Sequence, residues 1–89
     1  MKVVINDDLG GFGLSKKALE LLGTEDTHKY YNSDMRGDPK LVEVVEKLGE
    51  EANGFCADLK IVEIPDDVEW IIGEYDGSEW VAEKHRIWR

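Results

Sequence analysis

The pattern of apolar and polar residues changes period several times along the chain, and each period predicts an element. β-Strands are expected over residues 2–6, 59–64, 69–75 and 79 to about 86. The first contains Val3-Val4-Ile5, an apolar run that is typical of an interior strand. Asp76-Gly77 lies between the last two, and Asp-Gly favours a type I′ turn because both of its central residues need positive φ. The C-terminal third is therefore predicted to be a β-hairpin.

Two other stretches repeat their apolar residues at helical spacing. The first helix is expected to begin after Ser15, a good N-cap, and to end at Gly23, which suits a left-handed C-terminal residue. The second opens with Asp38-Pro39, a cap followed by proline at the first helical position, and ends at Asn53-Gly54. Both helices present one apolar face, which should pack on a sheet.

The segment between these helices, residues 24–37, is polar and has no clear period. It is expected to be a loop with room for a short strand near Tyr30-Tyr31. The element order is thus β-α-α-β-β-β in a single α+β domain over residues 1–89. We expect a small mixed sheet with both helices packed on one face.

Composition fits a folded chain and limits its partners. Hydrophobic residues make up 42 % and charged residues 35 %, and the formal net charge is −9. This charge argues against direct nucleic-acid binding, which requires a basic surface, and suits docking onto a basic protein. No apolar stretch could span a bilayer or act as a secretory signal. A core this thin would gain burial in a homodimer or higher homo-oligomer.

The single cysteine, Cys56, excludes an internal disulfide and fits a reducing cytoplasm. No basic residue lies beside it to activate the thiol, so it is expected to be buried filler.

A glycine-rich loop precedes the first helix and is the first candidate site. Gly11, Phe12 and Gly13, with Ser15 behind them, could direct backbone N–H groups at an anion. The spacing matches neither the dinucleotide fingerprint nor a P-loop. The alternative, favoured about two to one, is a tight connection in which Phe12 fills the core.

The chain ends in a cationic and aromatic run, Lys84-His85-Arg86-Ile87-Trp88-Arg89. Arg86 and Trp88 could grip a phosphate and stack a base. The alternative is a last strand whose charges meet neighbours such as Glu79 or Glu83. If Arg86 faces the glycine loop, an anionic ligand becomes plausible.

Other candidate chemistry is better explained by local structure. Asp66-Asp67 is typical of a turn, and adjacent carboxylates such as Asp7-Asp8 cannot form an acid–base pair across a cleft. His28, His85 and Cys56 lack metal-ligand spacing. Neither a catalytic residue, a metal site nor a cofactor motif is predicted. Arg36-Gly37-Asp38 spells an adhesion tripeptide, which we interpret as coincidence because Asp38 caps a helix.

Several ordered motifs resemble a family of small, largely uncharacterised bacteriophage and prophage proteins. The motifs are Asp7-Asp8-Leu9-Gly10-Gly11-Phe12-Gly13-Leu14-Ser15, Asp38-Pro39-x-Leu41-Val42, Val45-Glu46-x-Leu48-Gly49, Val62-Glu63-Ile64-Pro65-Asp66-Asp67-Val68, Tyr75-Asp76-Gly77 and Glu83-x-His85-Arg86-x-Trp88. A fainter resemblance is to the phage proteins that sequester cyclic ADP-ribose signals of the Thoeris defence system, which are small α+β oligomers with ligand between subunits.

These resemblances imply a non-enzymatic accessory protein of the anti-defence or host-takeover class, in the cytoplasm of a host cell. Its expected partner is a host protein or a small anionic nucleotide, the latter held by Gly11, Phe12, Gly13 and Arg86 at a subunit interface. The alternatives are a small enzyme acting on nucleotides and an acidic nucleic-acid mimic.

Overall fold

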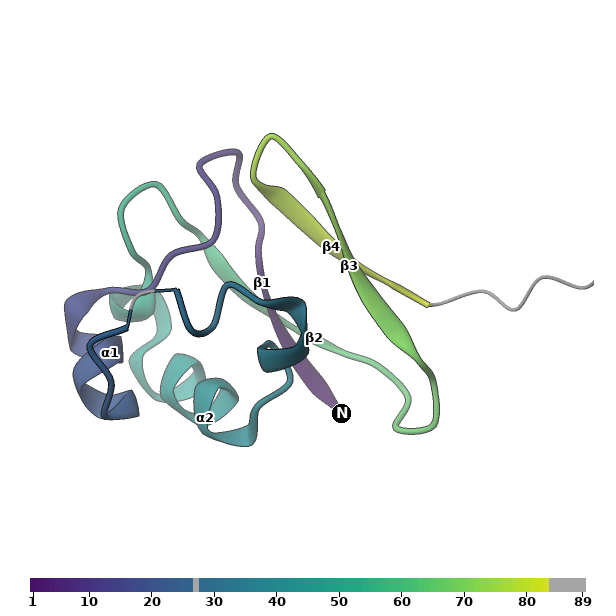
Figure 1. Ribbon diagram of the computed structural model, residues 1–89, viewed down its shortest axis with the longest axis horizontal. Coiled ribbons are helices and arrows are strands. Elements are labelled where there is room, and N and C mark those ends of the chain that lie inside the picture. Colours follow the sequence, from purple (N-terminus) through teal and green to yellow (C-terminus); the bar gives the residue numbers. More distant parts are fainter. Residues whose placement is uncertain (27, 84–89) are drawn as a thin grey trace, which may run out of the picture.

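The computed structural model describes residues 1–26 and 28–83, and it confirms the α+β class and the expected order of elements. The helices and strands are β1 (Lys2–Asn6), α1 (Lys16–Leu22), η1 (Ser33–Met35), α2 (Pro39–Leu48), η2 (Gly49–Ala52), β2 (Leu59–Glu63), β3 (Trp70–Tyr75) and β4 (Ser78–Glu83). The helices lie on one side of the β1–β2 pair and the β3–β4 hairpin on the other (Figure 1). Strand β1 is thus the middle of the molecule.

The strands form two antiparallel pairs, so the expected single mixed sheet is wrong. Strand β1 pairs with β2, and β3 pairs with β4 across the Asp76-Gly77 turn. The hairpin contacts β1 without joining its ladder. The outer edge of β1 is occupied instead by the backbone carbonyl of Arg36 and the carboxylate of Glu79. These groups leave no place there for a third strand.

The local signals for helix starts and for the hairpin turn are confirmed. Ser15 accepts a hydrogen bond from the Ala18 N–H, and Asp38 caps α2 from the position before Pro39. Asp76 and Gly77 have φ of +50° and +91°, as a type I′ turn requires.

Three expectations about loops and helix ends differ from the structure. The second helix was expected to continue to Asn53-Gly54. Instead α2 ends before Gly49, which has positive φ, and the short 3-10 helix η2 follows it to Ala52. Tyr30-Tyr31 lies in a turn and not in a strand. Cys56 is exposed, because its turn brings the Cys56 backbone against Gly10 and leaves the thiol outside the core.

The core lies between β1 and the helices. Val4, Ala18, Leu22, Leu41 and Val45 belong to one buried cluster. Phe12 is part of it, so the ring of the glycine loop does fill the core. Val3 and Ile5 are also buried and point to the opposite face of β1, on the side where the hairpin lies. Both faces of this strand are therefore covered, which explains its continuous apolar run.

Candidate functional site

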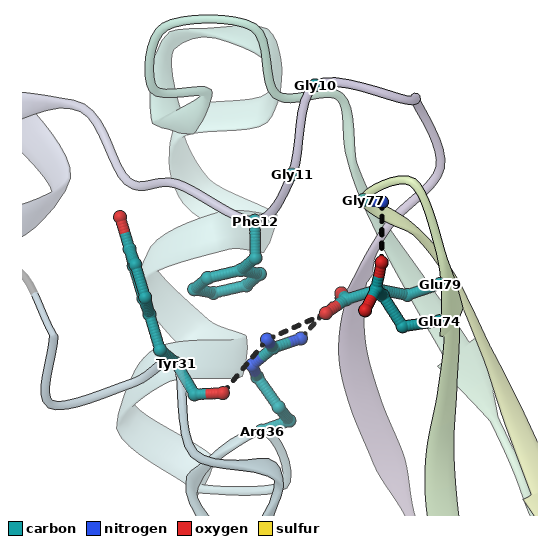
Figure 2. Close-up of a pocket in the computed structure, with 8 residues that line it drawn as sticks. All are labelled: Gly10, Gly11, Phe12, Tyr31, Arg36, Glu74, Gly77 and Glu79. Carbon is teal, nitrogen blue, oxygen red and sulfur yellow. Dashed lines mark hydrogen bonds and ion pairs between the residues drawn. The ribbon is translucent and has the colours of Figure 1, made fainter.

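A pocket of about 440 Å³ lies where the glycine loop meets the turn of the hairpin. It is lined by Gly10, Gly11 and Phe12 of the loop, by Tyr31 and Arg36, and by Glu74, Gly77 and Glu79 of the hairpin. Figure 2 shows the Arg36 side chain between the Phe12 ring and the Glu79 carboxylate. Three segments that are far apart in the sequence thus meet around one guanidinium group.

Arg36 forms a buried ion pair with Glu79. Its Nη1 lies 2.6 Å from Glu79 Oε1 and its Nη2 lies 2.9 Å from Glu79 Oε2. The side chains of Arg36 and Glu79 are only 3 % and 8 % exposed. The Arg36 Cζ also stacks 3.6 Å from the centre of the Phe12 ring. A bidentate pair with this burial is a fixed part of the structure.

All five N–H donors of Arg36 are engaged within the protein. Besides the two bonds to Glu79, Nε donates to the Tyr30 carbonyl at 2.6 Å, Nη2 to the Tyr31 carbonyl at 3.1 Å and Nη1 to the Val4 carbonyl at 3.4 Å. A guanidinium has five donors and no acceptor. Arg36 therefore has no free donor to offer to an anionic ligand.

The ion pair also closes the outer edge of β1. The Val4 N–H donates to the Arg36 carbonyl at 2.9 Å, and the Asn6 N–H donates to Glu79 Oε1 at 2.8 Å. Unpaired backbone groups on a strand edge are costly when they are buried. Arg36 and Glu79 satisfy these groups in place of a neighbouring strand.

The buried side chain of Asn6 connects the loop, the hairpin and β2. Its Oδ1 accepts from the Asp58 N–H at 2.7 Å, and its Nδ2 donates to the carbonyls of Asp8 at 2.5 Å and Gly77 at 2.7 Å. Asn6 is fully buried. An amide is needed here because the position requires one acceptor and two donors on the same side chain.

The hairpin turn packs directly on the glycine loop. A Cβ placed on Gly77 would overlap the Gly11 nitrogen and the Leu9 carbonyl oxygen. Glu74 fixes the other side of the turn, because its Oε1 accepts from the Gly77 N–H at 2.7 Å. The close approach forms the end wall of the pocket.

The lining of the pocket carries a net negative charge. Glu74 and Glu79 are directly opposite each other on neighbouring strands, and Arg36 neutralises only Glu79. The formal sum is +1 for the arginine and −2 for the two carboxylates, or −1. Like charges directly opposite each other on a sheet repel. A cation near Glu74 would relieve that repulsion, whereas an anion would increase it.

The predicted ligand residues are not all at this pocket. Gly11 and Phe12 line it. The Gly13 carbonyl accepts a hydrogen bond from the Gly54 N–H, and the Ser15 side chain caps α1 and donates to the Glu51 carbonyl. Arg86 and Trp88 are outside the described residues, so their predicted role stays a prediction. Within residues 1–26 and 28–83, no group of three or more His, Cys, Asp or Glu side chains could hold a metal ion.

The sequence interpretation missed the residues that organise the pocket. Arg36 had been set aside as part of a coincidental tripeptide, and Asn6 and Glu74 had no assigned role. Glu79 was named, together with Glu83, only as a possible neighbour of the C-terminal cations; in the structure it pairs with Arg36. One local signal was available: a polar residue, Asn6, directly continues the buried run of β1.

Comparisons of the chain with models of known protein families, with curated proteins and with solved structures find no match. Among the residues that the structure describes, no helix is both long and apolar enough to cross a membrane.

Proposed function

We propose that the protein is a non-enzymatic binding protein that takes a cationic side chain of a protein partner into the pocket beside Glu74. The observation that carries this proposal is the cross-strand pair Glu74–Glu79, of which only Glu79 has a cationic partner among residues 1–26 and 28–83. The resemblance to phage accessory proteins makes a basic host protein the proposed source of that side chain.

The lining of the pocket supports the binding of a lysine or arginine side chain. The Tyr31 side chain is 44 % exposed and packs edge-on against Phe12, with ring centres 5.6 Å apart. Glu74 and the Tyr31 ring line opposite sides of the same pocket (Figure 2), and each is a favourable contact for a guanidinium or ammonium group. The net charge of −9 would also steer a basic partner toward the protein.

A nucleotide ligand is less well supported by the same geometry. Its phosphate would face Glu74, and all Arg36 donors are already used. Sequestration of a signalling nucleotide would therefore depend on cations outside the described residues or on a second subunit.

A titration followed by two-dimensional NMR tests this proposal with N-acetyl-arginine amide as the probe. We expect the amide signals of Gly10, Gly11 and Gly77 to shift, with a dissociation constant of about 1 mM for a single side chain. Glu74→Gln should weaken binding about fivefold, which corresponds to the ~1 kcal/mol of one partly exposed charge pair.

The control variant is Asp67→Asn, which removes an exposed carboxylate from the turn before β3. It should bind the arginine probe within about twofold of the unsubstituted protein. Isomers of cyclic ADP-ribose provide the competing test. If they shift the pocket amides at micromolar concentration and the arginine probe shifts none, the proposed function is wrong.

A further inference from the structure

The outer face of the hairpin is apolar and uncovered. Strand register places Glu79 on the inner face, where it bonds Arg36, so the alternate positions point away from the protein. These outer positions are Ile71, Gly73 and Tyr75 on β3 and Ser78, Trp80 and Ala82 on β4. Ile71 and Trp80 are each 49 % exposed and Tyr75 is 70 % exposed. Three large side chains thus form one exposed apolar surface, which we call the outer hairpin face.

The indole of Trp80 is held in place on this face. A Cβ added to Gly73, its cross-strand neighbour, would overlap the Trp80 ring. Gly73 therefore leaves a hollow in which the indole lies flat over the backbone. An aromatic ring fixed before binding loses little conformational entropy when a partner covers it.

The sequence segment that contains the outer hairpin face is rich in acidic residues and contains no basic ones. Residues 61–83 include eight carboxylates and neither lysine, arginine nor histidine. The eight are Glu63, Asp66, Asp67, Glu69, Glu74, Asp76, Glu79 and Glu83. This stretch carries −8 in 23 residues, whereas residues 1–60 carry 8 basic and 12 acidic residues, or −4. Most of the net negative charge therefore belongs to residues 61–83, and the remaining residues 84–89 add three positive charges, which gives the total of −9.

We infer that the outer hairpin face docks onto a protein partner with an apolar centre and a lysine- or arginine-rich rim. Exposed tyrosine and tryptophan side chains, such as Tyr75 and Trp80, are typical of interface residues that contribute most of the binding energy. A second copy is a less suitable occupant, because the net charge of −9 on each copy opposes self-association. Nucleic acids and anionic membranes are repelled for the same reason.

This inference rests on the proposed function in one respect, because both require a basic partner. It assigns a different contact surface, on the side of the hairpin opposite the pocket. The tests of the two surfaces can therefore fail independently.

A synthetic amphipathic peptide of leucine and lysine serves as the probe, and fluorescence anisotropy measures its binding. Two peptides of the same length serve as references, one of leucine and glutamate and one of serine and lysine. We expect only the leucine–lysine peptide to bind well, and about 0.5 M salt should weaken it relative to about 50 mM.

The decisive variant is Ile71→Thr with Tyr75→Thr, which keeps β-forming residues on β3 and leaves Trp80 over Gly73. It should bind the leucine–lysine peptide at least about tenfold more weakly, since each hot-spot side chain contributes more than about 1 kcal/mol. The matched control is Phe55→Ser, because Phe55 is 96 % exposed and lies outside the hairpin. This control should bind within about twofold of the unsubstituted protein.

Equal binding by the double variant and the unsubstituted protein would overturn the inference. A dimer in sedimentation velocity that dissociates in the Ile71→Thr, Tyr75→Thr variant would also overturn it, by identifying a second copy as the occupant. If the arginine probe fails at the pocket but peptide binding still depends on Ile71 and Tyr75, the proposed function fails and the docking surface stands. The reverse result would retain the pocket and reject the outer hairpin face.

Discussion

Removing the charge of Glu79 should destabilise the protein more than any surface substitution. In Glu79→Gln, the glutamine keeps one oxygen for the Asn6 N–H and Arg36 Nη1, but its NH₂ group would replace the oxygen that accepts from Arg36 Nη2. Arg36 would then be a charge with 3 % exposure and no anionic partner. Breaking one side of a buried ion pair costs about 3–5 kcal/mol, because the remaining charge stays buried.

This loss is large relative to the total stability of so small a chain. At roughly 0.05–0.15 kcal/mol per residue, 89 residues give a free energy of unfolding of about 4–13 kcal/mol. Urea unfolding at neutral pH, followed by circular dichroism, measures the difference. The matched control is Lys17→Gln, which breaks the Lys17–Glu51 pair with side chains 59 % and 66 % exposed. Its loss should not exceed about 1 kcal/mol.

Two further measurements separate the buried pair from a general surface effect. The loss in Glu79→Gln should persist in about 0.5 M salt, because salt screens a buried pair poorly. An Arg36→Met, Glu79→Leu double variant should lose less stability than the sum of the losses in Arg36→Met and Glu79→Leu, because the second substitution removes the buried charge that the first leaves unpaired. If Glu79→Gln loses no more than Lys17→Gln, the ion pair does not hold the hairpin on β1 and our reasoning is refuted.

Two predictions concern the contact between the glycine loop and the hairpin turn. Gly77→Ala should lower the free energy of unfolding by at least about 2 kcal/mol, and Gly23→Ala should lower it by about 1 kcal/mol, as measured by urea unfolding. Both glycines have left-handed φ, but of these two only Gly77 has backbone atoms that an added Cβ would overlap. Equal losses would contradict the close packing. Asn6→Asp should be destabilised at pH 7, because its carboxylate would face the Asp8 and Gly77 carbonyls. Such a carboxyl group would have its pKa raised in the folded state, so stability should rise again as the pH falls toward 5, and a pH-independent loss would refute this account.

Local features of the fold could be predicted from the sequence because a few adjacent residues determine them. Ser15 and Asp38 cap helices through hydrogen bonds to residues two or three positions away. The Asp76-Gly77 turn depends only on the φ values that these two residues tolerate. No comparable run of adjacent residues indicates whether two strands pair in parallel or antiparallel. The alternation of side chains is the same in parallel and antiparallel sheets, so the mixed sheet could not be excluded from the pattern.

The candidate site depends on contacts between distant residues, and this explains why it was only partly predicted. Gly11 and Phe12 were identified because a glycine-rich turn is visible in the sequence. Arg36 and Glu79 are 43 residues apart, and no spacing rule connects them. The sequence interpretation named Arg86 as the arginine that could face the glycine loop, and that prediction falls outside the described residues. The arginine found beside the loop is Arg36, which stacks on Phe12.

The ion pair explains why an acidic hairpin is held so close to a central strand. Strand β1 needs partners for its outer backbone groups, and Arg36 and Glu79 supply them. Since Glu79 is used in this way, its cross-strand neighbour Glu74 is left as the carboxylate that faces the pocket without a cationic partner among the described residues. On the inner face of the hairpin, Glu79 thus maintains the fold, whereas Glu74 is available to a ligand. On the outer face, Trp80 packs over Gly73, whereas Tyr75 is 70 % exposed and Ile71 is 49 % exposed. Contact with a partner explains this exposed apolar surface better than the stability of the isolated chain does.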